Sequence, residues 1–295
     1  MKSDAAALPA YRTRASDYVA LAKPRLNGLV VASALAGYAM SGGDTSDVAK
    51  VLAVVIGTGF VAGGASAFNQ LIERDSDALM RRTRLRPLPD GRLHSAEAFA
   101  FATAISASGF AILAVGANVV SAAVAFATLA IYALVYTPLK RRTSFATVIG
   151  AIPGALPPTI GWAAGSGDLS QGAWVLFGIV FLWQLPHFLA IAWIYREDYA
   201  RAGLPMLPVI EPDGRSTARQ AIAYAAALLP VAMAPTLLGM TGTAYFAAAF
   251  VLTAALLVLS VRFGIDRSAA AARRLFYGSI LYLPLLWIVM IADRH

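Results

Sequence analysis

An amide and two carboxylates stand at the end of a long apolar run. The residues from Val48 to Phe68 are almost wholly apolar, and Asn69, Glu73 and Asp77 then follow at intervals of four. On a helix that continues past Phe68, this spacing places the three side chains on one face, because an α-helix has 3.6 residues per turn. Oxygen ligands of this kind suit Mg²⁺, so the triplet predicts a divalent-metal site.

Arginines crowd the same stretch, from Arg74 to Arg86. Beside a metal site, guanidinium groups are suited to a polyphosphate, which they bind as a planar fork. A solvated, salt-bridged loop after a membrane helix is the alternative. We favour metal and phosphate binding because a carboxylate at a membrane boundary is costly unless it is paired or metal-bound. The carboxylates also precede the arginines instead of alternating with them.

A second polar cluster closes a later apolar run, from Trp183 to Tyr199. His187 and Asp198 are eleven residues apart, so they share a face if one helix continues through both. The alternatives are a packed, hydrogen-bonded histidine and an interfacial charge pair of Glu197 with Asp198. The first cluster follows the second predicted membrane helix and the second cluster follows the sixth, so both are expected on the same side of the membrane. This placement predicts two acidic sites that face one cavity.

Two basic segments are candidates for binding a diphosphate. Lys23-Pro24-Arg25 opens the first predicted membrane helix, and Tyr136-Thr-Pro-Leu-Lys140-Arg141-Arg142 ends the fourth. Each is also explained as a cytoplasmic stop signal alone. Aromatic residues near the same side are mostly expected at the membrane interface or in packing, although a few could shield a carbocation with their ring faces.

The composition indicates which elements position these residues. Of 295 residues, 59% are hydrophobic and 14% are charged, whereas about a quarter of a soluble globular chain is charged. The apolar runs approach the roughly 20 residues that cross a bilayer as a helix. We therefore expect an all-α, polytopic membrane protein with a single domain, residues 24–295, after a cytoplasmic segment, residues 1–23.

The nine predicted helices are roughly 24–42, 49–69, 96–117, 119–138, 145–165, 172–194, 217–238, 243–262 and 274–292. Prolines inside several of them predict kinks that could open a central cavity.

The basic residues predict the orientation. With the N-terminus in the cytoplasm, all of the 24 Lys and Arg residues except Lys50 and Arg294 fall on the cytoplasmic side. The net charge of +8 therefore fits loops that face anionic lipid and an anionic substrate better than a nucleic-acid partner. The absence of cysteine excludes disulfides and thiolate metal sites. Neither a secretory signal nor a convincing transit peptide is found, which favours a bacterial inner membrane.

These motifs resemble a known family. Asn69-x-x-x-Glu73-x-x-x-Asp77, with Met80-Arg-Arg-Thr-Arg-Leu-Arg86-Pro-Leu-Pro89 after it, resembles the first signature of the UbiA-type membrane prenyltransferases. Further stretches are similar to the branch of that family that farnesylates haem: Ala22-Lys-Pro-Arg-Leu26, Tyr136-Thr-Pro-Leu-Lys-Arg141, Trp183-Gln-Leu-Pro-His-Phe188, Tyr195-Arg-Glu-Asp-Tyr199 and Ala202-Gly-Leu-Pro-Met-Leu-Pro208.

The resemblance implies a nine-helix bundle with a central cavity. It implies Mg²⁺-assisted transfer of a farnesyl group from farnesyl diphosphate to a vinyl group of haem B, which gives haem O for haem–copper oxidases. Membrane lipids and a downstream haem A synthase are the further partners that it implies. Carried onto this sequence, it assigns the metal to Asn69, Glu73, Asp77 and Asp198, the diphosphate to Arg25, Arg74, Arg86, Lys140 and Arg141, and the haem pocket to Tyr136, Trp183, His187, Tyr195, Arg196 and Glu197.

Two departures from the general family pattern leave alternatives open. Glu73 stands where many members have Asp, and the second site offers His187 and Asp198 in place of Asp-x-x-x-Asp. Both departures fit the haem branch, but the second-site metal ligands stay open. The rival functions are prenylation of an aromatic or quinone precursor, transport of an anionic lipid or metabolite, and haem binding without chemistry.

Overall fold

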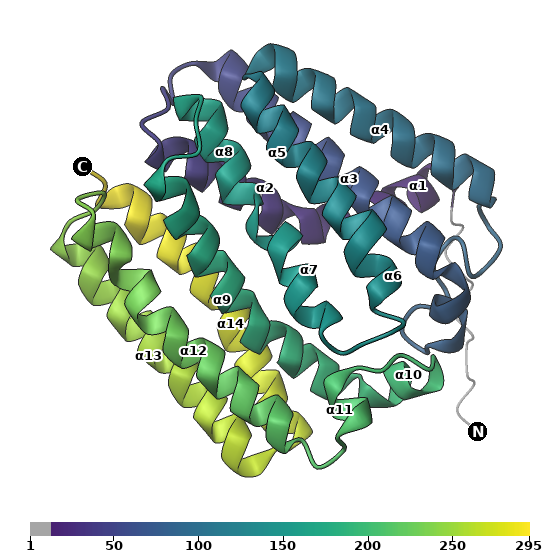
Figure 1. The fold of residues 1–295 in the computed structure, drawn as a ribbon. Helices are drawn as coiled ribbons and strands as arrows, with labels where there is room; N and C mark the ends of the chain where they lie inside the picture. The colour runs from purple at the N-terminus through teal and green to yellow at the C-terminus, as the bar shows by residue number, and fades with distance from the viewer. Residues whose placement is uncertain (1–12) are drawn as a thin grey trace, which may run out of the picture.

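The computed structural model describes residues 13–295, and residues 1–12 of the predicted cytoplasmic segment lie outside the described residues. In the described part every named secondary-structure element is a helix, and its one β-type contact is an isolated bridge between Thr241 and Arg294. The all-α prediction is therefore confirmed. Figure 1 shows the helices as long, closely packed rods. In chain order they are α1 (Arg14–Ala22), α2 (Pro24–Met40), α3 (Val48–Leu79), α4 (Ser95–Gly116), α5 (Val119–Ala130), the π-helix η1 (Ile131–Tyr136), α6 (Thr137–Leu139), α7 (Ala146–Ala155), α8 (Pro157–Ser166), α9 (Gln171–Ile194), α10 (Arg196–Arg201), α11 (Leu207–Ile210), α12 (Arg215–Leu237), α13 (Thr243–Asp266) and α14 (Ala269–Ala292).

Seven helical segments of residues 13–295 are long and apolar enough to cross a membrane, which confirms a multi-pass membrane protein. They are α3, α4, the continuous segment Val119–Leu139, α9, α12, α13 and α14. The pair α1 and α2 becomes an eighth if its 40° bend is counted within one span. A helix lies in every one of the predicted ranges, but α7 and α8 are only 10 residues each.

The fifth predicted helix is broken because of its prolines. Leu156 separates α7 from α8, and Pro157 and Pro158 follow it directly. Proline has no N–H to donate, so the chain cannot continue the helical hydrogen bonds through this point. In the fourth predicted helix, Pro138 follows the π-helical residues 131–136, where the hydrogen-bonding pattern is loosened.

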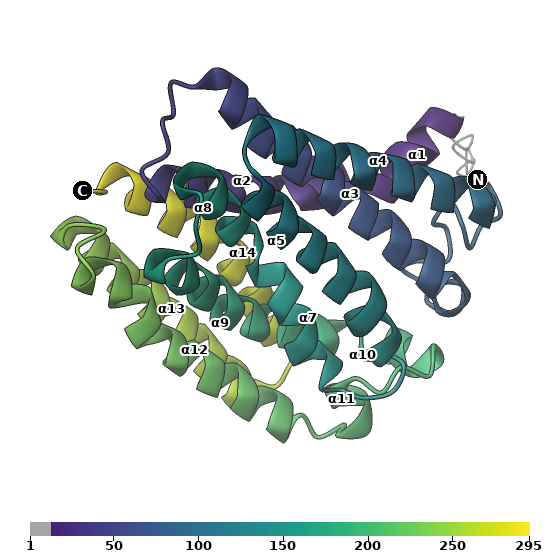
Figure 2. The ribbon, with the colours of Figure 1, turned by 45° about the horizontal axis from the view of Figure 1, so that its top comes forward.

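The helices form two groups that meet at α9. On one side α3 packs against α4 and α2 packs against α8, while on the other α9 packs against α12 and α14. The 45° rotation in Figure 2 keeps α12 and α13 side by side and on the side of the molecule away from α3 and α4. The C-terminal end of α3, α6, α10 and α11 gather at one end, at the lower right in Figure 1.

Two glycines let α2 and α8 touch through their backbones. A Cβ atom at Gly37 would lie 1.9 Å from the Pro158 carbonyl oxygen, and one at Gly161 would lie 1.7 Å from the Ala34 carbonyl oxygen. Small residues permit such close helix packing, which in a bilayer replaces the missing hydrophobic driving force. The short α8 is therefore held in the bundle by α2.

The second predicted helix, 49–69, is longer than expected. The helix α3 begins after Asp47, whose side chain accepts from the Lys50 N–H, and it ends only at Leu79. It therefore carries the predicted acidic triplet within its own regular hydrogen bonding, beyond its apolar part.

Candidate active site

The acidic face of α3, which we define as Asn69, Glu73 and Asp77, has its three side chains on one side of the helix, as the four-residue spacing predicts, and it is buried. These side chains belong to residues that are 5%, 5% and 0% exposed. Asp75 lies off this face, has a side chain that is 76% exposed and forms an ion pair with Arg74. The helix thus does continue past Phe68, and its helical phase separates Asp75 from the three residues of the acidic face.

Cations and a hydroxyl from other elements meet this face. Lys140 donates from Nζ to the two Glu73 carboxylate oxygens at 3.1 and 3.3 Å. Arg86, in the segment after α3, donates to Asp77 Oδ2 at 2.6 Å. Asn69 donates from Nδ2 to Thr137 Oγ1 at 3.3 Å.

The electrostatics of Lys140 follow from this pairing. Burial is the largest single influence and lowers the pKa of Lys140. The charge and hydrogen bond of the Glu73 carboxylate, together with Tyr199 and Tyr132, raise it, and the net result is a pKa above its ordinary value. Lys140 therefore remains a charged donor beside the acidic face. Lys23, in the turn between α1 and α2, is close enough to interact electrostatically with Arg86, Asp77 and Glu73.

One oxygen of the acidic face has no partner. Asp77 Oδ1 is buried and accepts no hydrogen bond, which is costly for a carboxylate unless a cation compensates it. Residues 13–295 contain no group of three or more His, Cys, Asp or Glu side chains close enough to hold a metal by themselves. Mg²⁺ needs only one or two carboxylates when water and phosphate oxygens complete its shell, so the donor set fits this ion together with a diphosphate.

Asp198 reaches the same end of the molecule on a helix of its own. The condition under which His187 and Asp198 would share a face is not met, because α9 ends at Ile194, at the end of the predicted range 172–194, and a separate helix, α10, carries Asp198. Asp198 accepts from the backbone N–H groups of Arg81 and Arg82, both at 3.3 Å, and pairs with Arg201. It therefore binds the segment that directly follows α3.

His187 instead faces α14. Its Nδ1 lies 2.8 Å from Ser279 Oγ, and that hydroxyl lies 2.6 Å from the Phe276 carbonyl oxygen. The short oxygen–oxygen contact needs the serine proton between its two atoms, so Nδ1–H of His187 is the donor to Ser279. The other ring nitrogen, Nε2, then carries a lone pair. Trp183 donates from Nε1 to the Ser279 carbonyl at 2.8 Å, and Phe276 stacks on the imidazole at 4.9 Å.

Several predicted diphosphate residues are not brought to the acidic face. Arg74 is exposed and bonds to Asp75 and Ser95, because it lies on the outer side of α3. Arg25 is also exposed, at the start of α2. Arg141 donates to the Ile72 carbonyl at 2.8 Å, which fixes it beside α3 but off the acidic face.

The remaining predicted pocket residues lie around the α9–α10 junction or against α7. Tyr195 is covered by the Arg82 guanidinium at 4.7 Å, and Arg196 lies over the Trp193 ring at 4.6 Å. Glu197 is exposed. Tyr136 contacts Tyr132 within η1, with the ring centroids 5.2 Å apart and the rings tilted by 38°.

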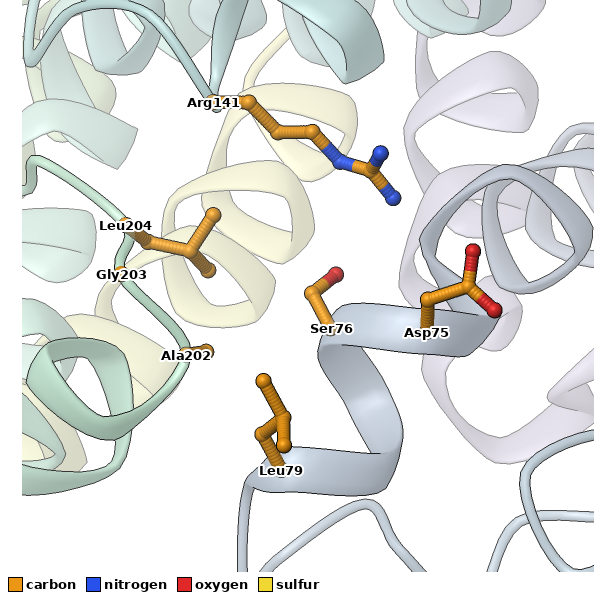
Figure 3. Close-up of a pocket in the computed structure, with 7 residues that line it drawn as sticks. All are labelled: Asp75, Ser76, Leu79, Arg141, Ala202, Gly203 and Leu204. Atoms are coloured by element: carbon orange, nitrogen blue, oxygen red, sulfur yellow. The ribbon is translucent and has the colours of Figure 1, made fainter.

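A pocket of about 260 Å³ opens beside the end of α3. Figure 3 shows Arg141 pointing towards Ser76 and Asp75 across it, with Gly203 and Leu204 of the segment after α10 on the opposite wall. None of the three residues of the acidic face lines this pocket. It therefore does not correspond to the predicted central cavity.

Sequence reasoning missed the residues that depend on tertiary contact. Thr137 accepts a hydrogen bond from Asn69, and the backbone N–H groups of Arg81 and Arg82 donate to Asp198. No sequence spacing relates these groups to their partners. Ser279 is 92 positions from His187 and stands in an apolar helix without any motif. Only the approach of α14 to α9 identifies it.

Comparison with known proteins covers nearly the whole chain. The chain is 48% identical to the protoheme IX farnesyltransferase of Solibacter usitatus over 94% of its own length and 98% of that relative. It is 41% identical to the protoheme IX farnesyltransferase of Myxococcus xanthus over 100% of its length and 99% of that relative.

Solved structures share the fold at low identity. A UbiA homologue from Aeropyrum pernix superposes with a TM-score of 0.73 at 22% identity and covers 91% of this chain and 98% of its own. A UbiA homologue from Archaeoglobus fulgidus bound to GPP and Mg²⁺ gives a TM-score of 0.67 at 17% identity and covers 93% and 99%. The model of the UbiA prenyltransferase family matches residues 30–286, and the chain belongs to this family.

Proposed function

We propose that this protein transfers the farnesyl group of farnesyl diphosphate to a vinyl group of haem B and so forms haem O. The observation that carries the proposal is the buried acidic face of α3, met by Lys140 and Arg86. Curated relatives called protoheme IX farnesyltransferase support the choice of substrate, at 40–48% identity over almost the full chain. A UbiA homologue bound to GPP and Mg²⁺ supports a prenyl diphosphate and a metal.

The acidic face would hold Mg²⁺, with Asn69, Glu73 and Asp77 as ligands and Asp198 as a further candidate. When bound, this ion would neutralise the charge of the departing diphosphate. The buried, unpartnered Asp77 Oδ1 supports this assignment.

The chain's cations take up the remaining charge. Lys140 and Arg86 are paired with the acidic face, so both stand where a diphosphate would approach it. They stabilise the charge that develops as the bond between the farnesyl carbon and the diphosphate oxygen breaks. The resemblance also assigns the diphosphate to Arg25, Arg74 and Arg141. To reach it, Arg74 and Arg141 would have to leave their present partners, and Arg25 would have to move in from the surface.

No side-chain nucleophile is needed for this reaction. The allylic cation left by the diphosphate is attacked by the electron-rich vinyl group, and water then adds to the haem side chain. The aromatic faces of Tyr136 and Trp183 are candidates for shielding the cation. His187 is the candidate for orienting haem, since its Nε2 lone pair has no partner among the described side chains. Tyr195, Arg196 and Glu197 would complete the haem side of the pocket.

The proposed setting is a bacterial inner membrane with the active site towards the cytoplasm. We propose that all nine predicted segments cross it around a central cavity, with α7 and α8 as one broken span. The distribution of Lys and Arg supports this orientation. A downstream haem A synthase is the proposed protein partner.

The proposal is tested by pigment analysis in a host that makes haem B but no haem O. Membranes that contain this protein are expected to contain haem O, and added farnesyl diphosphate should increase its amount. Farnesyl transfer to hydroxybenzoate but not to haem would establish the quinone-type alternative instead. Unchanged haem together with uptake of an anionic lipid would establish the transporter.

A further inference from the structure

A second pocket, of about 530 Å³, lies between α12 and α13, away from the candidate active site. We call it the α12–α13 groove and define it by Arg215, Arg219 and Arg267 at its rim and Ile222, Val261 and Ile265 along its wall. No residue of the acidic face of α3 lines it. Figure 2 shows α12 and α13 on the side of the molecule away from α3. The groove is therefore separate from the proposed reaction.

The rim carries positive charge that the protein does not neutralise. Arg219 donates to the Ser216 hydroxyl, and Arg267 donates to the Gly264 carbonyl, so each is bound to an uncharged group. Arg215 has the one ion pair of the rim within residues 13–295, with Asp213 at 3.2 Å, and both side chains are largely exposed. Ion pairs this exposed contribute little, so the rim remains an anion-attracting surface.

Two other carboxylates near the groove do not cancel this charge. Asp266, beside Arg267, accepts from the Ser268 hydroxyl, and Glu211 accepts from the Ser216 N–H, while no ion pair links either one to a rim arginine in the described chain. Arg267 itself is held in the left-handed region at φ 46°, as the residue that ends α13. Its guanidinium is thereby fixed over the last turn of that helix.

The wall of the groove is apolar and open to its surroundings. Ile265 is 77% exposed and Val261 is 38% exposed, on a helix long and apolar enough to cross a membrane. An exposed apolar wall directly below a basic rim matches an amphiphile with an anionic head and a hydrocarbon tail. Basic pockets between membrane helices recognise anionic lipid headgroups in this way.

We propose that the α12–α13 groove binds one anionic phospholipid. Arg219 and Arg267 bind the headgroup phosphate as guanidinium forks, and Arg215 adds charge at the rim. One acyl chain lies against Ile222, Val261 and Ile265. A zwitterionic lipid of the same chain length fits the wall but lacks the net charge that the rim selects.

The test measures the thermal stability of the purified full-length protein in detergent with added lipid. Phosphatidylglycerol is expected to raise the Tm by several degrees more than phosphatidylcholine with the same acyl chains, because it binds only the folded state. The double variant R219Q/R267N should lose this difference, and asparagine is chosen at 267 because it tolerates the left-handed backbone. The matched control is Arg262→Gln, which removes one exposed charge from α13 without touching the groove.

A second variant keeps the test decisive if the double variant does not fold. Ala223→Trp fills the groove from an exposed position on α12 and leaves every arginine in place, and it should abolish the phosphatidylglycerol effect as well. Equal protection by phosphatidylcholine, protection by inorganic phosphate alone, or an R262Q variant as impaired as R219Q/R267N would each overturn the proposal.

Discussion

At the scale of the residue, the polar groups of the site are oriented by hydrogen bonds and ion pairs with neighbouring groups. Lys140 is kept charged inside the protein by Glu73, and Asp77 gives one oxygen to Arg86 while the other stays unpaired. His187 is held in one tautomer by a hydroxyl from another helix. Under the proposed function, the metal and haem would be bound by groups that the protein has already oriented.

The tautomer of His187 can be tested through Ser279. Ser279→Ala removes the acceptor of Nδ1–H, and we expect haem to bind roughly tenfold more weakly, as loss of a group that orients a metal-binding histidine does. The measurement is an absorption titration of the purified protein with haem B. Ser279→Thr should keep most of the affinity, because it keeps the hydroxyl.

Two further variants distinguish a positioning role from a packing role. Ser260→Ala is the control, since Ser260 is equally buried and donates only to the Leu256 carbonyl of its own helix. In a double-mutant cycle, Ser279→Ala should add little to the loss caused by His187→Ala. Additive losses would show that Ser279 acts independently of His187, contrary to this account.

At the scale of the residue, the sequence predicts which side chains share a helix face, because this follows from the helical period. The spacing of Asn69, Glu73 and Asp77 was sufficient to place them on one face, and the phase of Asp75 was sufficient to place it off that face, whereas the burial of the face is known only from the structure. Arg74 could have been placed outside by the same argument, but the family pattern assigned it to the diphosphate. Thr137 and Ser279 could not have been predicted, because their partners come from distant elements.

At the scale of the element, the breaks in the helices decide which groups meet. Tyr195 separates α9 from the short α10, and α10 places Asp198 against the backbone of Arg81 and Arg82. A continuous helix would have kept Asp198 in line with His187. The break therefore joins the second acidic cluster to the first.

Asp198 is predicted to hold the segment after α3 in place. Asp198→Asn weakens the ion pair with Arg201 and replaces one of the two accepting oxygens by an N–H donor. We expect trypsin to cleave faster after Arg81 and Arg82, measured by mass spectrometry of the folded protein in detergent. Glu197→Gln, a neighbouring exposed position, should cleave like the wild type. Equal cleavage in all three proteins would mean that Asp198 does not anchor this segment.

Element boundaries were the least predictable feature of the chain. Apolar runs locate the helices, but α3 continues ten residues past the end predicted for it, because its polar end is still in regular helical hydrogen bonding. Pro157 and Pro158 divide the fifth predicted helix into two short ones, whereas Pro186 is accommodated within α9. Whether a proline breaks or only bends a membrane helix depends on its neighbours, which the sequence does not reveal.

At the scale of the whole molecule, the helical membrane architecture agrees with what composition predicted, and the family assignment agrees with what the motifs resemble. The charge distribution adds an orientation that can be measured directly. Because the chain has no cysteine, single cysteines can be introduced without removing any. Thr45 and Pro212 are exposed and lie on opposite predicted sides.

Labelling of these two positions tests the number of crossings. With a membrane-impermeant maleimide on intact spheroplasts, Thr45→Cys is expected to react and Pro212→Cys to react only after lysis. The prediction requires α7 and α8 to cross together. Labelling of both positions in intact spheroplasts would mean that this pair enters and leaves on one side.

The central claim is that the acidic face of α3 makes haem O formation possible. Its most direct test compares haem O produced from haem B and farnesyl diphosphate by purified wild type, Asp77→Asn and Asp75→Asn. Asparagine keeps the size of either side chain, and Asp75 lies on the same helix but is exposed. The account predicts haem O from wild type and Asp75→Asn, and a loss of at least about 100-fold in Asp77→Asn, as when one transition-state charge contact is removed. Full activity in Asp77→Asn, or equal loss in both variants, would contradict it.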